Sequence, residues 1–149
     1  MPDDLSRTVF SDLGRALGIE GLAPEADGSC RLVFDGNRLV EMNASPAQRR
    51  LLVSCRLAQS AGNNTETLRL LMRASYLGAG AGGGWFALGP QDRLYLHCAF
   101  PLAEASGAML LHAIERLLDH VDTWERRLQE GALQDQAAMA RMASFVNRI

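Results

Sequence analysis

Hydrophobic residues recur along this chain with two different periods, and each change of period marks a boundary between expected elements. From Leu5 to Leu17 a large aliphatic side chain stands at every fourth position, which predicts an amphipathic helix over residues 4–18. A loop rich in glycine, proline and acidic residues follows. Three segments after it alternate apolar and polar positions, as strands do: CRLVF, RLVEMN and RRLLVSCRLA.

The polarity of the first two strands predicts how they pair, because residues that face each other across a ladder share one side of the sheet. A two-residue turn would place Leu32 opposite Glu41. A three-residue turn over residues 36–38 pairs Leu32 with Met42 and keeps one side apolar, so we expect that register. The third strand extends the apolar side, and a mixed set of residues occupies the other: Arg31, Val33, Leu39, Glu41, Leu52, Ser54 and Arg56.

A second helix and a hairpin are predicted in the middle of the chain. The helix begins at about Thr65, where Asn63 and Glu66 have the spacing of a capping box. It ends at a cluster of glycines, which we interpret as a flexible turn: Gly78, Gly80, Gly82, Gly83 and Gly84. In the segment WFALGPQDRLYLHCAF, a five-residue connection would pair Leu88 with Leu94 and place four residues on the opposite side: Trp85, Ala87, Tyr95 and His97.

The last long helix spaces its apolar residues four and three apart from Leu110 to Leu128. After Gly131 the sequence becomes polar and then regains Met139, Met142, Phe145 and Ile149 at helical spacing, either as a loosely packed additional helix or as a mobile arm. The complete order, α-β-β-β-α-β-β-α, predicts an α+β fold with a twisted antiparallel five-stranded sheet packed by helices. We place this domain at residues 4–129 and a helical or mobile extension at 130–149.

Composition and charge exclude several classes of partner. Acidic and basic residues are interspersed and the formal net charge is -2, so no basic stripe is present to bind nucleic acid. The start, MPDDLSRTVF, lacks the basic and apolar regions of a secretory signal. No segment approaches the roughly 20 apolar residues of a membrane span. We therefore expect a cytoplasmic protein that neither binds nucleic acid nor inserts into a membrane.

Residue types that carry chemistry are present without the arrangement that chemistry requires. The segment GAGAGG matches a dinucleotide-binding pattern, but a helix precedes it and a strand follows, which inverts the required context. His97 and Cys98 are neighbours on a strand and point to opposite sides, while His112 and His120 are too far apart for a helical metal pair. The three cysteines stand at apolar strand positions and are expected to be buried thiols: Cys30, Cys55 and Cys98. We predict no enzyme, no metal and no cofactor.

The order of elements and several local motifs together resemble the class I type III secretion chaperones of the CesT/SycE type, the Tir chaperone family. The motifs are LLMRASYLGA at the end of the second helix, the WFALGPQDRLYL hairpin, FPL before the last helix, and Trp124 near its end. The resemblance covers about residues 4–128. Members of the family commonly end soon after the last helix, whereas this chain continues for about twenty residues.

The resemblance implies an ATP-independent homodimer that keeps the amino-terminal segment of a secreted effector extended and secretion-competent. The secretion ATPase is a further candidate partner. A client segment would add a strand or fill apolar pockets, so no cofactor is implied. The dimer would cover the second helix and the fourth strand, which gives five interface candidates: Leu68, Leu71, Met72, Trp85 and Tyr95.

Candidate contacts with the client lie on the outer side of the sheet and on the first helix. Val33, Leu39 and Leu52 are the aliphatic residues of the mixed outer side, and shielding by long neighbours is the alternative for them. Val9 and Phe10 are candidates on the first helix, with ordinary core packing as the alternative. The terminal segment could itself occupy the client surface when no client is bound.

Two other functional classes remain open at this point. One is a non-catalytic α+β domain that encloses a small ligand, which would require a closed apolar cavity. The other is an enzyme that uses Cys98 or His97 as an isolated reactive group, which would require an accessible and reactive side chain.

Overall fold

The computed structural model describes residues 3–61 and 64–146. Within this part of the chain, eight helices and strands follow one another in the predicted order, which confirms the α+β class: α1 (Asp4–Leu17), β1 (Ser29–Phe34), β2 (Arg38–Ser45), β3 (Arg50–Ser60), α2 (Thr65–Ser75), β4 (Trp85–Leu88), β5 (Arg93–Pro101) and α3 (Gly107–Val146). Short 3-10 turns stand between some of them: η1 (Tyr76–Gly78), η2 (Pro90–Asp92) and η3 (Leu102–Glu104).

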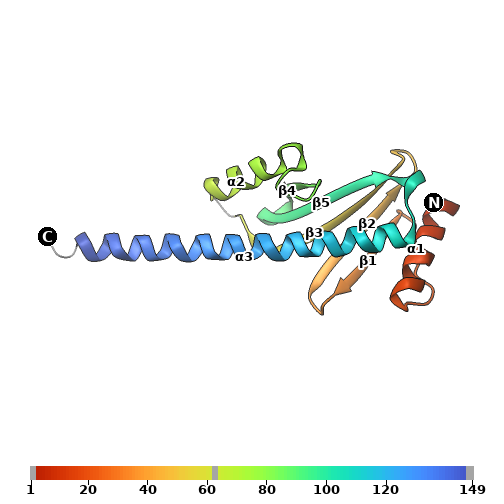
Figure 1. The fold of residues 1–149 in the computed structure, drawn as a ribbon, viewed down its shortest axis with the longest axis horizontal. Helices are drawn as coiled ribbons and strands as arrows, with labels where there is room; N and C mark the ends of the chain where they lie inside the picture. The colour runs from red at the N-terminus through yellow and green to blue at the C-terminus, as the bar shows by residue number, and fades with distance from the viewer. Residues whose placement is uncertain (1–2, 62–63, 147–149) are drawn as a thin grey trace.

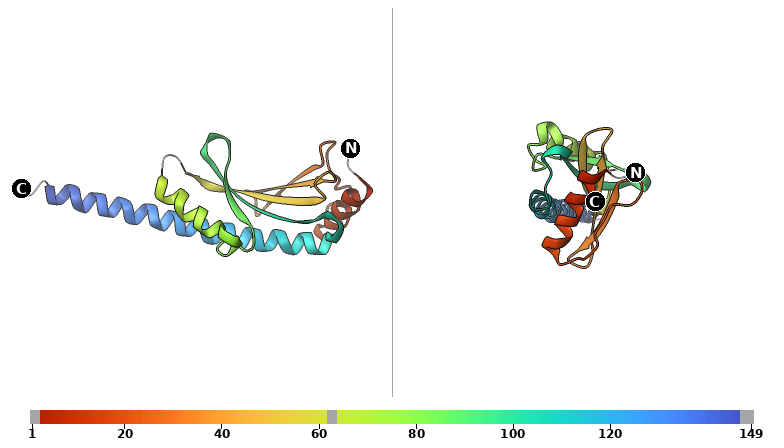
Figure 2. Two further views of the ribbon diagram at one scale, coloured as in Figure 1. Left: turned by 90° about the horizontal axis from the view of Figure 1, so that it is seen from above. Right: turned by 90° about the vertical axis from the view of Figure 1, so that its right-hand side faces the viewer.

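The strands form one twisted antiparallel sheet in the order β1-β2-β3-β5-β4, so β1 and β4 are its edge strands (Figure 1). The predicted pairing of the β4–β5 hairpin is confirmed, with Leu88 opposite Leu94. The helices lie on the same side of the sheet, as the view from above in Figure 2 shows. The other side, which we call the outer face, is not covered by any helix in the described part of the chain.

The predicted pairing of β1 with β2 is wrong by two residues. Leu32 lies opposite Val40 rather than Met42, because the connecting turn begins earlier than expected, at Asp35. Asp35 has a positive φ of 50°, a conformation that aspartate adopts more readily than most residues with a side chain. Polarity alone did not reveal this turn. A shift of two residues keeps every side chain on its own side, so the predicted apolar side is confirmed.

The core lies between the apolar side of the sheet and the first half of α3. Alternation on the strands and the four-three spacing on α3 each gather apolar residues on one side, and the two sides bury each other. The fully or almost fully buried residues at this contact come from the central strands and from α3: Val40, Met42, Leu51, Val53, Cys55, Leu57, Leu94, Leu96, Leu110, Ile114, Leu117, Val121 and Trp124.

Local capping fixes the starts of the first two helices. The Asp3 side chain accepts a hydrogen bond from the backbone N–H of Ser6 at 2.9 Å and so caps α1. Asn64 caps α2 in the same way, accepting from the backbone N–H of Thr67 at 3.0 Å. The cap predicted at Asn63 lies outside the described residues.

The glycine-rich turn between α2 and β4 is closely packed, so the interpretation of it as a flexible turn is wrong. A Cβ at Gly84 would stand 1.9 Å from the backbone oxygen of His97, and only glycine fits this close approach. The backbone oxygen of Gly80 accepts a hydrogen bond of 2.9 Å from the indole N–H of Trp124. The glycines therefore let the turn lie directly against β5 and α3.

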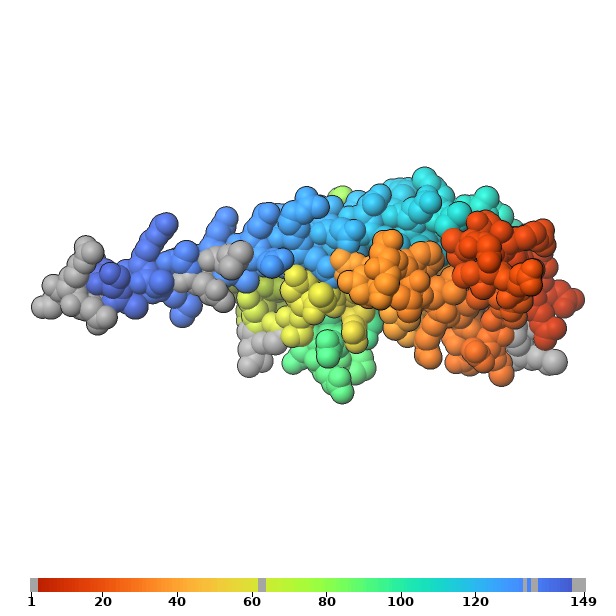
Figure 3. All heavy atoms as spheres, turned by 90° about the horizontal axis from the view of Figure 1, so that it is seen from below, coloured from red at the N-terminus to blue at the C-terminus, as the bar shows by residue number. Residues whose placement is uncertain are grey.

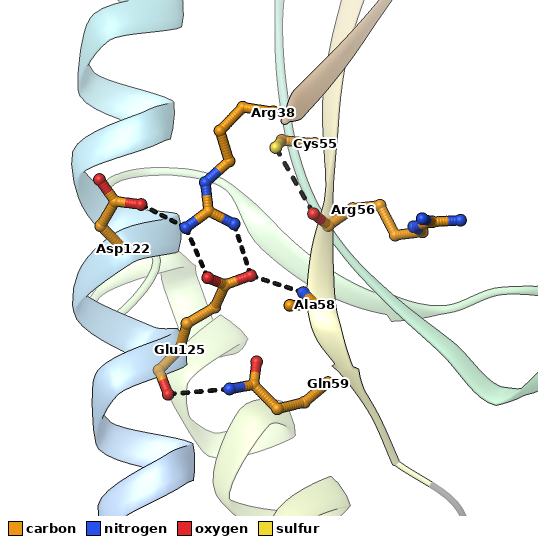
Figure 4. A network of polar contacts seen from close by, with 7 residues as sticks. All are labelled: Arg38, Cys55, Arg56, Ala58, Gln59, Asp122 and Glu125. Atoms are coloured by element: carbon orange, nitrogen blue, oxygen red, sulfur yellow. Dashed lines mark hydrogen bonds and ion pairs between the residues drawn. The ribbon is translucent and has the colours of Figure 1, made fainter. Parts of the chain in front are cut away.

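A network of polar contacts attaches α3 to the sheet at the level of Glu125 (Figure 4). The Arg38 guanidinium donates to both carboxylate oxygens of Glu125, at 2.6 and 2.5 Å, and to Asp122 at 2.5 Å. Glu125 also accepts from the backbone N–H of Ala58, and the Gln59 side chain donates to the Glu125 backbone oxygen at 3.0 Å. Burial alone would raise the pKa of Glu125, but the hydrogen bonds from Arg38 and Ala58 outweigh burial and lower it.

α3 is one uninterrupted helix of 40 residues, which confirms the expected C-terminal helical extension; in the described residues it continues the last helix and is neither a separate helix nor a mobile arm. It runs through Gly131 to Val146 and has a length of about 60 Å at 1.5 Å per residue. Figure 3 shows its second half projecting from the body of the molecule. None of the helices in the described ranges has a stretch that is both long and apolar enough to cross a membrane.

Candidate functional site

Polar and aromatic side chains form a continuous row across the outer face. The row crosses all five strands because the pairing sets one residue of each strand side by side: Arg31, Glu41, Ser54, His97 and Trp85. Arg31 and Glu41 form an ion pair of 3.0 Å, and Ser54 Oγ lies 2.5 Å from His97 Nδ1. The Trp85 ring centroid is 5.7 Å from that of His97. The outer face is thus organised by contacts of its own.

His97 is a half-buried titratable group in the middle of this row. Burial, and secondly the charge of Arg50, lower its pKa below the ordinary value. The Tyr95 ring stacks beside it, with centroids 6.1 Å apart and planes inclined by 14°. Sequence analysis missed the Ser54–His97 contact. Predicting it requires the register of β3 against β5, and these strands are not joined by a short turn from which a register can be inferred.

The structure brings together two of the predicted client contacts on the outer face. Val33 and Leu39 are direct partners across the β1–β2 ladder, and their side chains are 62% and 39% exposed. Leu52 lies on the same face but opposite Asn43 and is half-buried. Val33 and Leu39 therefore form an apolar pair at the β1 edge of the sheet, and Leu52 stands apart from it.

Val9 and Phe10, the candidates on the first helix, are buried in the core. Their exposed fractions are 2% and 0%, and α1 packs them on the side of the molecule that α3 covers. This is the core packing that the sequence left as the alternative. A client could reach these two side chains only if α1 moved away from the body.

The five predicted interface residues lie on both sides of the sheet edge formed by β4. Leu68 and Met72 of α2 line an open apolar hollow of about 250 Å³ together with Phe86 and Leu88. Met72 is 74% exposed, whereas Leu71 is buried at 2%. Trp85 and Tyr95 are half-buried on the outer face. A single subunit interface can include the α2 residues together with Trp85 and Tyr95 only if it wraps around the β4 edge of the sheet.

Sequence reasoning missed further apolar residues beside this hollow. Tyr76 and Leu77, which follow α2 directly, are 73% and 87% exposed, and Leu88 is 50% exposed. Leu77 also has a positive φ of 54°, which is unusual for a large residue. The sequence feature that could have identified Tyr76 and Leu77 is their position together directly before the glycine cluster. We call Leu68, Met72, Tyr76, Leu77 and Leu88 the α2/β4 surface.

A second open groove contains several residues that were considered for chemistry. It has a volume of about 250 Å³ between the glycine-rich turn, β5 and α3, and its lining includes Cys98, His112, Arg116 and His120. Burial raises the pKa of Cys98 to about 11, so this thiol stays protonated and unreactive near neutral pH. Among the described residues, no three histidine, cysteine or carboxylate side chains are grouped as a metal site would require.

Comparisons with solved structures agree on the fold. A chain of the HopA1–SchA chaperone–effector complex matches with a TM-score of 0.70 at 19% identity, covering 84% of this chain and 99% of that one. A chain of the complex between the Yersinia pestis type III secretion chaperone SycH and a stable fragment of YscM2 matches with a TM-score of 0.66 at 18% identity, covering 79% and 98%. A chain of the ExoT–SpcS complex from Pseudomonas aeruginosa gives 0.62 at 17% identity, covering 82% and 98%.

The sequence itself identifies the family. A search of curated protein sequences returned no significant match. The sequence profile of the Tir chaperone protein (CesT) family matches residues 8–125, from the second turn of α1 to the glutamate that attaches α3 to the sheet. This range contains the whole sheet and most of the chain, and the solved structures share its fold. The chain therefore belongs to the Tir chaperone protein (CesT) family.

Proposed function

We propose that this protein is a homodimeric type III secretion chaperone that binds the amino-terminal segment of an effector in extended form. Bound in this way, the effector stays soluble and ready for secretion. The observation that carries the proposal is the presence of two exposed apolar surfaces on a chain whose core is already complete. One is the Val33–Leu39 pair on the outer face, and the other is the α2/β4 surface.

The client surface of the proposal is the outer face near β1. β1 is an edge strand, so its free backbone groups can pair with an extended segment, while Val33 and Leu39 offer apolar contacts beside it. Leu52 lies on the same face of the sheet but apart from this pair, and would be a separate contact on the central strand β3. We leave Val9 and Phe10 out of it because both are buried in the core.

The dimer surface of the proposal is centred on α2 and the β4 edge. Exposed apolar residues gathered on one surface are typical of subunit interfaces. Leu68 and Met72 would contact the second copy directly, and Trp85 and Tyr95 would do so where it wraps around β4. Leu71 would contribute only by supporting α2 from below, since it is buried.

The remaining partners of the proposal follow from the same role. An effector chaperone acts in the bacterial cytoplasm, where the client is synthesised, and passes the client to the secretion ATPase. Binding through backbone pairing and apolar pockets requires no cofactor and no catalytic group. The raised pKa of the Cys98 thiol supports a role without nucleophilic catalysis.

The geometry does not favour a small-ligand domain. Such a domain buries most of its ligand in an enclosed apolar cavity. The hollow beside α2 and the groove beside β5 both open to solvent, as do two more polar ones at the β1–β2 side and at the end of α1. An extended chain fits open surfaces better than a metabolite does.

The proposal is tested by isolating the tagged protein from its source bacterium under native conditions. Mass spectrometry then identifies the proteins that co-purify, and light scattering on the same sample gives the stoichiometry. We expect two copies of this chain with one secreted protein bound through its amino-terminal segment. A monomer, or a pool in which no secreted protein is enriched over an untagged control, would contradict the proposal.

A further inference from the structure

The second half of α3 carries an apolar surface that no other described part of the chain covers. Trp124 is the last residue of the helix that is buried among the described side chains, and Leu128 still packs partly against the core. We call residues 131–146 the distal helix. Three of its apolar side chains are widely exposed: Met139 at 71%, Met142 at 70% and Phe145 at 67%.

This exposed surface continues the side of α3 that packs on the sheet. Met142 follows Leu128 by two heptads, and Phe145 follows Met142 by three residues, so both positions repeat the four-three spacing of the buried seam. A straight helix turns by only about 20° per heptad against such a repeat. The distal apolar residues therefore face the same general direction as the core residues, but beyond the end of the sheet.

The attachment at Glu125 determines where the distal helix leaves the body. Gln59 near the end of β3 contacts Glu125, and α2 begins at Thr65 shortly after β3 ends. Figures 1 and 2 show that the helix leaves at the end of the molecule where α2 lies, far from α1 at the opposite end. The distal helix therefore points away from its own core while it starts next to the α2/β4 surface.

The α2/β4 elements alone are small for a stable interface. α2 has 11 residues and β4 has four, whereas a stable protein interface takes about 20–30 residues from each partner. The distal helix also leaves the apolar side chains of Met139, Met142 and Phe145 in water, which favours a partner that covers them. The α2/β4 surface and the distal helix adjoin at the same end of the molecule. One partner that covers both would therefore enlarge the interface and also bury the exposed side chains of the distal helix.

We propose that the distal helix is a second part of the subunit interface, with Met139, Met142 and Phe145 packed against the other copy of this chain. The inference rests on the proposed homodimer and adds to it. The family match ends at residue 125, and the solved relatives are matched over 91–99% of their lengths while covering 79–84% of this chain. The distal helix is thus an addition to the region that the family shares.

The test compares two double variants of the full chain by sedimentation equilibrium over a range of concentrations. M142E/F145E places charge in the apolar seam, and A140E/S144E places the same charge on the opposite side of the same helix, where both residues are exposed. We expect the first to raise the dimer dissociation constant at least about tenfold and the second to leave it within about twofold. Circular dichroism checks that both variants keep their helix content.

A photo-reactive benzoylphenylalanine in place of Phe145 gives a direct readout of what the helix contacts. In a mixture of isotopically light and heavy protein without client, we expect adducts between light and heavy chains, mapped to residues 65–88 of the other copy. Adducts within one chain, or seam and control variants with equal dissociation constants, would overturn the inference. Loss of client binding with an unchanged dimer would also overturn it, because the client would then be the occupant.

The variant M72E separates this inference from the proposed dimer. If M72E dissociates the dimer and M142E/F145E does not, the homodimer stands and the role of the distal helix fails. If the unaltered chain is a monomer at every concentration, the proposed dimer itself fails and the inference fails with it.

Discussion

At the scale of single residues, exposure decides which apolar side chains are available for recognition. Val33 and Leu39 alternate with core residues on their strands, so their position on the outer face follows from the sequence. Val9 and Phe10 stand on an equally apolar helix and are buried. The sequence could not separate these cases, because an amphipathic helix shows where an apolar side exists and not whether another element covers it.

A charge at Val33 tests the client surface. Because the side chain is 62% exposed, V33E should leave the thermal unfolding midpoint within about 2 °C of the unaltered protein, since surface substitutions change stability little. It should nevertheless abolish co-purification of the effector, because the charge would be desolvated at the contact. N37E adds the same charge at an exposed turn position nearby and should retain the effector. Retention of the effector by V33E would exclude Val33 from the contact.

His97 gives a prediction for pH. Its folded-state pKa lies below the unfolded value, so the unfolded chain takes up a proton before the folded chain does as the pH falls. The contribution of His97 to stability is therefore fully present above the unfolded pKa of about 6.5, decreases below it, and levels off below the folded pKa. In urea titrations between pH 7.5 and pH 5, H97Q should lose less stability than the unaltered protein. Parallel slopes for H97Q and the unaltered protein would contradict the assignment.

At the scale of elements, the Arg38–Glu125 contact decides how α3 is held. The extents of most elements follow from periodicity and capping, but this ion pair joins residues far apart in the sequence and no local pattern reveals it. Continuation of α3 through Gly131 was missed for another reason. The polar residues directly after Gly131 interrupt the apolar periodicity, but the segment is rich in alanine, glutamine and methionine, whose helix propensity outweighs one glycine.

Removal of Arg38 should destabilise the fold. The Arg38 and Glu125 side chains are 17% and 13% exposed, so R38M leaves a largely buried carboxylate without its partner. We expect a loss of about 2–4 kcal/mol in the free energy of unfolding, measured with urea. R31M breaks an ion pair whose side chains are 63% and 48% exposed and should cost less than about 1 kcal/mol. Equal losses for the two variants would show that burial at the α3 contact contributes nothing.

At the scale of the whole molecule, the fold buries one side of the sheet under helices and leaves apolar surface at the Val33–Leu39 pair, at the α2/β4 surface and on the distal helix. The single-sided core follows from alternation on the strands and from the seam of α3. The place where α3 leaves the body does not follow from the sequence, because it depends on the long-range contact at Glu125. The packed glycine-rich turn was equally hidden, since close backbone approach at Gly84 leaves no periodic signal.

Amide hydrogen exchange, compared between the free chaperone and its complex with the co-purified effector, tests the central claim that a second copy and a client cover these surfaces. The account predicts that residues 65–75 and 85–88 exchange slowly in both states, because the second copy already covers them. It also predicts that residues 29–45 become slower only when the effector is bound. Fast exchange of residues 65–75 in both states, together with no change at residues 29–45, would contradict the account.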